Sequence, residues 1–322
     1  MDIKDIMSFE EFQYKFIQGI NEGGIETDIF HALQINREVT AVVNKNGNQL
    51  RPTIYIEDSY RDYMYGKAMV DIINDASAIL KNTNDYAPEL PTINDTIQKD
   101  KLYCSIINKE NNIELLKKIP HQDLKDLDLT LVTRYKVGNN ASVLVDNRMC
   151  ASMKLTSEEL LNIAKENTFN SEYAFKTLYD TIIDLGVFSR DELFENINMD
   201  YSFADNQVFV LTNKAGFHGA SLLASKQVLN EIHDKLDSNY YILPSSIHEV
   251  IILPEKYVDK GALDYMKFMV SDINEYVVDT KDILSDNIYY YDTKTCKLSI
   301  ADGKERCHSE ATDKIKTPTR GR

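Results

Sequence analysis

Several residue types that often decide the class of a protein are scarce in this sequence. It has no tryptophan, seven prolines and four cysteines in 322 residues. The cysteines, at positions 104, 150, 296 and 307, show no C-x-x-C spacing, so neither a common zinc motif nor a disulfide framework is indicated. No apolar stretch approaches the roughly 20 residues that cross a bilayer. We therefore expect free thiols, no membrane segment and a cytoplasmic location.

Positive charge is also in deficit. The chain has 36 Lys and Arg against 51 Asp and Glu, a net charge of −15. Binding to duplex nucleic acid needs a basic face that displaces counterions from phosphates, so bulk nucleic-acid binding is not expected. The start, MDIKDIMSFEEFQYKF, has acids where a secretory signal needs a basic region followed by an apolar run. These properties are typical of an acidic protein that is not secreted.

The last twenty residues differ from the rest. Residues 303–322 carry six basic and three acidic side chains, and they show no apolar periodicity. We expect a compact body over residues 1–302 and a flexible basic tail over 303–322. A further division of the body into subdomains of about 1–100 and 101–302 is left open.

Sequence motifs of the common catalytic and cofactor sites are missing. Neither G-x-x-x-x-G-K-[ST] nor G-x-G-x-x-G occurs, so no standard phosphate-binding loop is present. His248-Glu249 resembles half of a zinc-protease motif, but Ile252 stands where the second histidine would be needed. The glycines between 216 and 219 are expected to form a turn. We therefore expect neither a metal site nor a cofactor.

Apolar periodicity predicts a mixture of helices and strands. Strand pairs and helices are interspersed without regular β-α-β alternation, so we expect an α+β fold with largely antiparallel strand pairs among amphipathic helices. Residues 127–137 alternate at period two, which predicts one buried and one solvated face. Helices are expected from Ser8 to about 22, from Ser59 past Ile79, after Thr156, from Ser189, from Ser225 and from Asp259; strands are expected at 38–44, 52–57, 127–137, 207–212, 219–223, 240–244, 248–254, 287–291 and 296–300.

The densest group of chemically active side chains lies in LPSSIHEV, residues 243–250. A serine activated by a histidine is the basis of nucleophilic catalysis, so Ser245, Ser246 and His248, with His121, are candidate catalytic residues. The simpler interpretation is a hairpin turn at 244–246, with His248 and Glu249 on opposite faces of the second strand. We favour the hairpin.

Several segments together resemble a known family. The segment YILPSSIHEVIILP (241–254) is the most specific, and it is followed by MVSDIN and LSDNIYYYD; PTIYIED, IPHQDLKDLDLTLVTRYKV and EELLNIAKENT occur earlier. The chain resembles the bacterial domain-of-unknown-function family 5688 over about residues 8–302. The resemblance implies no activity. It implies a source in low-GC Gram-positive bacteria, often near mobile elements.

Two functions remain open. The first is a non-enzymatic accessory protein that binds an unidentified protein partner, with association to a mobile element as an open possibility, because every catalytic motif tested is missing and an acidic surface can steer basic partners. The alternative is a hydrolase with its site around Ser245, Ser246 and His248. The sequence does not determine the oligomeric state.

Overall fold

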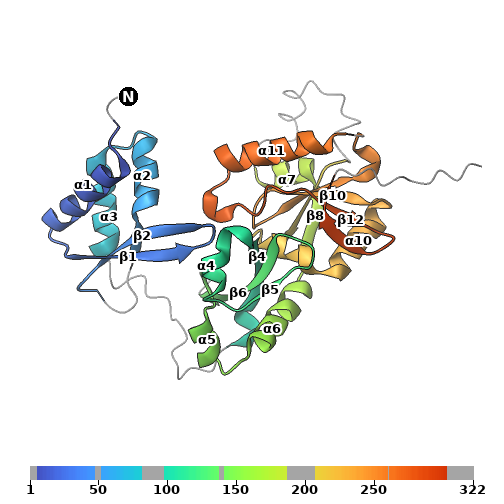
Figure 1. Cartoon of the computed structure of the whole chain (residues 1–322), viewed down its shortest axis with the longest axis horizontal. Coiled ribbons are helices and arrows are strands. Elements are labelled where there is room, and N and C mark those ends of the chain that lie inside the picture. The colour runs from blue at the N-terminus through green and yellow to red at the C-terminus, as the bar shows by residue number, and fades with distance from the viewer. Residues whose placement is uncertain are drawn as a thin grey trace, which may run out of the picture.

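The structure is a computed structural model that describes residues 6–47, 52–81, 98–137, 141–186, 207–259 and 261–302. These residues form three sheets with helices packed against them (Figure 1), and the strand pairs are antiparallel. The expected α+β class is therefore confirmed. Among the described residues, no helix has the length and apolarity to span a membrane. The expected helix from Ser189 and the tail over 303–322 lie outside the described residues.

The N-terminal unit contains three helices and the first sheet. The Ser8 side chain accepts a hydrogen bond from the Glu11 backbone N–H at the start of the first helix, as expected, and Phe12 and Phe16 are buried below it. The elements are α1 (Phe9–Glu22), β1 (Thr27–Gln34), β2 (Arg37–Asn44), β3 (Thr53–Tyr55), α2 (Ile56–Met64) and α3 (Met69–Lys81).

Two predictions for this unit were wrong. The single helix expected from Ser59 past Ile79 is two helices, because Gly66 has φ 94° and the chain turns between α2 and α3. The strand β1 was not expected, although it pairs with β2 along its whole length. Its middle is exposed, so it lacks the clean alternation that identifies a half-buried strand.

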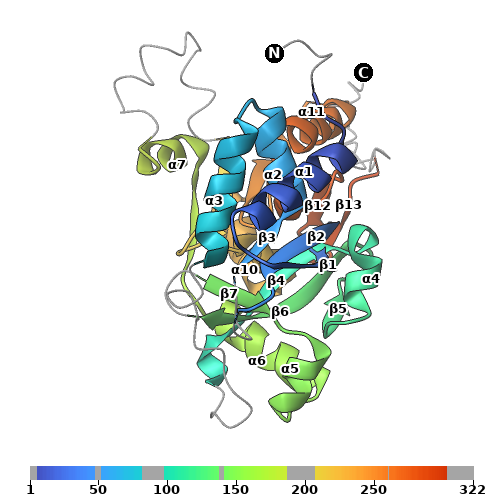
Figure 2. The same ribbon diagram turned by 90° about the vertical axis from the view of Figure 1, so that its left-hand side faces the viewer.

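Hydrogen bonds and an ion pair join the N-terminal unit, drawn in blue in Figure 2, to the rest of the chain. Asn36, in the turn between β1 and β2, donates its side-chain N–H groups to the carbonyls of Thr280 and Ile283. Arg61 of α2 lies 3.3 Å from a carboxylate oxygen of Asp279. The tip of the hairpin therefore rests on the segment that precedes β12. Whether the unit is a separate subdomain stays a prediction.

The second sheet is built around β6. The prediction of one solvated face was wrong, because Thr130 and Val132 are fully buried; Ile107 and Leu116 cover that side, and α6 covers the other. That face opens to solvent only at Arg134 and beyond. The elements are β4 (Leu102–Asn108), α4 (Ile113–Leu116), β5 (His121–Asp123), β6 (Leu129–Val137), β7 (Ala141–Leu144), α5 (Asn147–Ser152) and α6 (Ser157–Phe169), the last with the expected capping box of Thr156 and Glu159.

The third sheet has the strand order β13-β12-β10-β11-β9-β8. Tyr240, Tyr289 and Tyr291 are buried in its core, together with side chains of α10. As expected, α10 begins after its N-cap, Ser225. The expected strand at 219–223 is instead a buried 3₁₀ helix, η4 (Gly219–Ala224). The other elements are β8 (Tyr173–Thr177), α7 (Leu178–Asp184), β9 (Phe209–Asn213), α10 (Lys226–Leu236), β10 (Tyr240–Pro244), β11 (Val250–Pro254), α11 (Leu263–Tyr276), β12 (Tyr289–Asp292) and β13 (Lys297–Ile300).

A buried carboxylate connects the second and third sheets. Asp128, before β6, accepts hydrogen bonds from Asn108 in β4 and from Ser285, Asn287 and Tyr289 near β12. Four neutral donors thereby replace the water that the charge loses on burial. The two sheets are thus held at one orientation beside the site described next.

Candidate functional site

The candidate residues Ser245, Ser246 and His248 lie in the connection between β10 and β11. The hairpin is confirmed, with Pro244 opposite Val250, but the connection runs from Ser245 to Glu249, so the prediction that His248 and Glu249 lie on the second strand was wrong. The Ser246 hydroxyl accepts a hydrogen bond from the His248 backbone N–H at 3.0 Å. Ser246 therefore stabilises the turn, and it contacts the main chain of His248 in place of its imidazole.

His121 lies in the second sheet, on β5 opposite Val132. Its ring is exposed and its Nδ1 lies 3.0 Å from the carbonyl oxygen of Ile119. Within the described part of the chain, no hydrogen bond links His121 to Ser245, Ser246 or His248. The structure therefore does not assemble the four candidates into one hydrogen-bonded set, and their catalytic role stays a prediction.

His248 instead faces two groups that the sequence did not single out. Its Nδ1 accepts the backbone N–H of His218 at 3.1 Å, so the hydrogen of the neutral ring is on Nε2. That nitrogen lies 3.4 Å from a carboxylate oxygen of Asp282 in η6 (Thr280–Asp282). Because both ring nitrogens are engaged, this arrangement leaves no lone pair directed at a serine hydroxyl.

His218 is held in an unusual environment. It adopts the left-handed conformation with φ 61°, and only 2% of its surface is exposed. Its Nδ1 lies 3.0 Å from the Ser105 hydroxyl, and its Nε2 is buried without a partner among the described residues. Burial, together with the positive charge of Arg134, lowers the pKa of His218 to about 2. The ring is therefore neutral at physiological pH and is a weak base.

Close packing at Gly219 fixes the turn that carries His218. The Gly219 N–H and the Thr212 hydroxyl both donate to the carbonyl oxygen of His248, at 2.9 and 2.8 Å. A Cβ atom at Gly219 would lie 2.5 Å from the backbone nitrogen of Asn213 and 2.7 Å from that same carbonyl oxygen. Only glycine fits here, and the turns at 218 and 248 are thereby locked together.

The two histidines support an exposed aromatic ring. Phe217 stacks on His248, with ring centroids 4.8 Å apart at an angle of 26°, and meets His218 edge-on at 4.2 Å. Although it makes these contacts, 47% of its surface is exposed. The ring of Tyr103 in β4 also lies near His218, with the ring centroids 5.8 Å apart. The histidine pair, His218 and His248, therefore forms a rigid support behind Phe217.

A pocket opens beside the Phe217 ring. Its volume of about 660 Å³ is within the usual range for small-molecule sites. We call it the β4–β9 pocket. Burial raises the pKa of the Cys104 thiol in its wall to about 12, so this thiol is protonated and not a nucleophile. The lining comprises Asp100, Lys101, Leu102, Tyr103, Cys104, Lys136, Asn167, Thr168, Ser171, Glu172, Asn213, Lys214, Ala215 and Phe217.

The pocket is locally positive although the chain is acidic. Three lysines and two acids line it, whereas the whole chain has a net charge of −15. Lys214 pairs with Glu172. Within the described residues, Lys101 and Lys136 form no ion pair. Two ammonium groups are thus available to a ligand.

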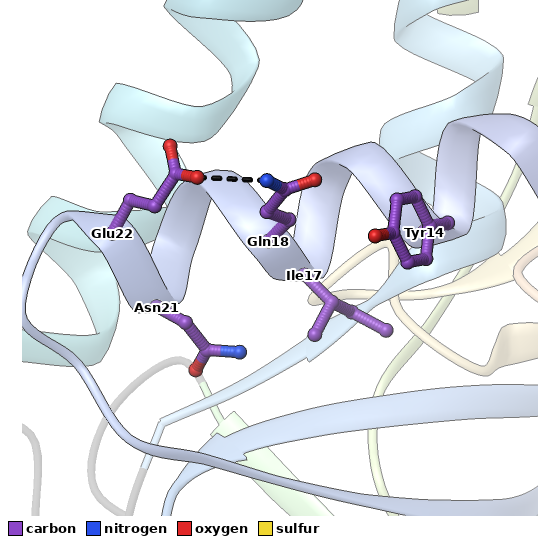
Figure 3. A pocket seen from close by; sticks show the side chains of 5 residues that line it. All are labelled: Tyr14, Ile17, Gln18, Asn21 and Glu22. Carbon is purple, nitrogen blue, oxygen red and sulfur yellow. Dashed lines mark hydrogen bonds between the residues drawn. The ribbon is translucent and has the colours of Figure 1, made fainter.

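A second, shallower pocket of about 500 Å³ lies along α1 (Figure 3). One helix supplies its whole lining: Tyr14, Ile17, Gln18, Asn21 and Glu22. Three of its four polar side chains already form hydrogen bonds, since Gln18 donates to Glu22 at 2.8 Å and Asn21 accepts from Thr27. It is lined by neither Lys nor Arg, so the β4–β9 pocket is the stronger candidate for a functional site.

Sequence reasoning missed most of this site. His218 and Asp282 lie 30 or more residues from His248, and no short motif joins them. The lysines come from separate elements, so only the fold brings them together. No group of three or more His, Cys, Asp or Glu side chains in the described residues is arranged to hold a metal.

The comparisons with known proteins identify the family. The family model described as "Family of unknown function (DUF5688)" matches residues 8–293. Searches of curated proteins and of solved structures found no match. The match confirms the resemblance seen in the sequence and includes all residues of the β4–β9 pocket. The chain belongs to the DUF5688 family of unknown function.

Proposed function

We propose that this chain is a non-enzymatic binding protein whose β4–β9 pocket takes a small anionic ligand with a flat aromatic part, of the chemical class of the nucleotides. The observation that carries the proposal is that one pocket combines an exposed, fixed ring at Phe217 with Lys101 and Lys136, which form no ion pair with any residue that the structure describes.

The ring supports recognition of a flat group. Phe217 is half-exposed, yet its orientation is fixed by stacking on His248 and by the locked turn at Gly219. A ring fixed before binding loses little conformational freedom when a ligand stacks on it. Stacking of a base on an aromatic side chain contributes about 1–3 kcal/mol.

The lysines support recognition of an anion. Lys101 lies in η2 (Lys99–Lys101), before β4, and Lys136 lies on β6, so two elements direct charge at one space. Lysine ammonium groups are common phosphate ligands and act as point charges. In a chain of net charge −15, a locally positive pocket would select anions against the surrounding field.

The hydrolase alternative has less support. His218 is neutral and weakly basic, and both nitrogens of His248 are engaged, so neither imidazole is arranged as a general base. Binding to a protein partner, association with a mobile element and a cytoplasmic location also stay predictions.

Calorimetric titration tests the proposed function. We expect adenosine 5′-monophosphate to bind the full-length chain more tightly than either adenosine or inorganic phosphate, because only the nucleotide uses both the ring and the lysines. Lys136→Ala should weaken binding about fivefold to tenfold, corresponding to the loss of about 1 kcal/mol for one charge-assisted contact. The matched control is Lys226→Ala, an exposed lysine outside the pocket.

Two results would contradict the proposal. One is equal binding of the nucleotide by the Lys136→Ala variant, the Lys226→Ala variant and the unmodified chain. The other is no detectable binding of any of the three probes at millimolar concentration.

A further inference from the structure

Helix α11 presents an apolar surface to solvent. Its inner side is fixed, because Met266, Val270 and Asn274 are buried against the protein. In both views α11 lies along the upper edge of the molecule (Figures 1 and 2). The large apolar side chains exposed on α11 and at its C-cap are Tyr265 (66%), Phe268 (66%), Met269 (36%), Ile273 (43%), Tyr276 (72%) and Val277 (77%).

Most of these side chains share one face. At 100° per residue, Tyr265, Met269 and Tyr276 fall within about 40° of one another, and Phe268 and Ile273 flank them. We call this set the outer face of α11. Large apolar side chains gathered on one surface commonly mark an interaction site.

The charge on the outer face has a single sign. Asp272 lies among the apolar residues, and Asp264 and Glu275 border them; all three are exposed. Hydrogen bonding to Glu275 and the charge of its carboxylate raise the pKa of Tyr276, and Asp272 adds to this effect. The only basic residue of the helix, Lys267, is partly buried and lies toward the opposite flank. A partner must therefore offer both apolar surface and positive charge.

Two occupants from this chain fit poorly. An antiparallel pairing of α11 with a second copy, centred on the helix, would bring Asp264 opposite Glu275 and gather acidic side chains of both copies at one interface, which is repulsive. Residues 303–322 have the right charge, but they contain one large aliphatic residue, Ile315. Neither can satisfy both the apolar and the acidic part of the surface.

We propose that the outer face of α11 docks a basic amphipathic helix of a partner protein. Apolar side chains of that helix would pack between Tyr265, Phe268 and Tyr276, and flanking Lys or Arg side chains would meet the three carboxylates. The 14 residues of α11 span about 21 Å, which accommodates roughly four turns of a partner helix. This surface does not involve the β4–β9 pocket, so the inference is independent of the proposed small-molecule ligand.

A synthetic helix can serve as the probe. We would measure, by fluorescence anisotropy, binding of the full-length chain to an 18-residue Leu/Lys peptide with its leucines on one face. The comparison peptides are the same pattern with Glu in place of Lys, and the Leu/Lys composition in scrambled order. We expect binding of the amphipathic basic peptide alone, with affinity that falls as salt is raised.

Substitutions then locate the binding surface. Phe268→Ser and Tyr276→Ser should each weaken binding about tenfold, as expected for aromatic anchors, and Asp272→Asn should weaken it less and reduce the salt dependence. Tyr14→Ser is the matched control, because Tyr14 is 69% exposed on α1. Circular dichroism would check the fold of each variant.

Several results would overturn the inference. They are failure of the basic amphipathic peptide to bind, equal binding of the acidic or scrambled peptide, and equal loss of affinity in the Tyr14→Ser variant. Sedimentation showing a dimer that Phe268→Ser dissociates would also overturn it, since the occupant would then be a second copy.

Discussion

The histidine pair and the β4–β9 pocket share Phe217 but differ in how their polar groups are satisfied. Around His218 and His248, nearly every polar atom is bonded to a neighbour, and Gly219 permits no added atom. In the pocket, Lys101 and Lys136 form no ion pair within the described residues, and much of Phe217 is exposed. One region is closed, with only Nε2 of His218 left without a partner among the described residues, and the other is open.

This difference distinguishes polar groups that stabilise the fold from polar groups that can bind a ligand. A buried polar group bonded on all sides stabilises one conformation and has little capacity for a new partner. An exposed ammonium group beside a fixed ring has little desolvation penalty in the free protein, and it is available to bind a ligand. The histidines, which attract attention in the sequence, thus position the site, and the lysines are the groups that would contact a ligand.

Gly219→Ala should have the largest effect on stability. The new Cβ would lie within 2.7 Å of backbone atoms that cannot move aside cheaply, so we expect a loss of about 3 kcal/mol. Gly216→Ala is the control; its site is open, and φ 65° should cost about 1 kcal/mol. Urea unfolding measures both. Equal losses would show that the turn at Gly219 is not locked.

His218 should make the protein sensitive to acid. The folded pKa of about 2 lies below the ordinary 6.5, so between these values the unfolded chain binds a proton that folded His218 does not. Stability from this group is present above pH 6.5 and falls below it, by up to about 1.4 kcal/mol per pH unit.

His218→Asn removes the titrating group and tolerates the left-handed backbone. We expect its loss of stability from pH 7 to pH 5 to be smaller than that of the unmodified chain, by up to about 2 kcal/mol. Urea midpoints at the two pH values give the comparison. The same acid loss in both proteins would contradict the burial of His218.

His248→Ala should show whether His248 supports the Phe217 ring or takes part in catalysis. Its side chain is 24% exposed, so we expect a loss of only about 1 kcal/mol of stability. Phe217 would lose its stacking partner, and nucleotide affinity should fall a few-fold. Calorimetry measures the affinity, and thermal melting measures the stability. Unchanged affinity would mean that Phe217 does not need this support.

Lys101→Ala should have the smallest effect on stability, within about 0.5 kcal/mol, because within the described residues Lys101 has no ion pair to lose. Its effect should instead be on ligand affinity. A substantial drop in melting temperature would show that Lys101 stabilises the fold, and the contrast between the closed histidine region and the open pocket would no longer hold.

Local signals in the sequence predicted much of the fold. Helices with side-chain caps, such as those after Ser8, Thr156 and Ser225, were found because capping is a property of three or four adjacent residues. The β10–β11 hairpin was found because its turn residues are likewise close together in the sequence. β1 was missed because tertiary contacts define it, and its own side chains do not alternate.

The site was harder to predict because it depends on distant contacts. The pairing of β4 with β6 places Tyr103 opposite Arg134, and η6 brings Asp282 to His248 from 34 residues further along the chain. His248 was noticed as a candidate, but its partners were not. The turn over residues 216–219 was expected, but the strand predicted at 219–223 was wrong, since apolar residues in a buried 3₁₀ helix look like those of a buried strand.

The most direct test of the central claim is ³¹P NMR of adenosine 5′-monophosphate with a stoichiometric amount of the full-length chain. If the pocket binds without chemistry, the nucleotide signal shifts or broadens, the Lys136→Ala variant reverses that change, and no new phosphorus signal appears over time. Appearance of free phosphate with the unmodified chain, abolished by His248→Ala in a folded variant, would contradict the account and establish a hydrolase.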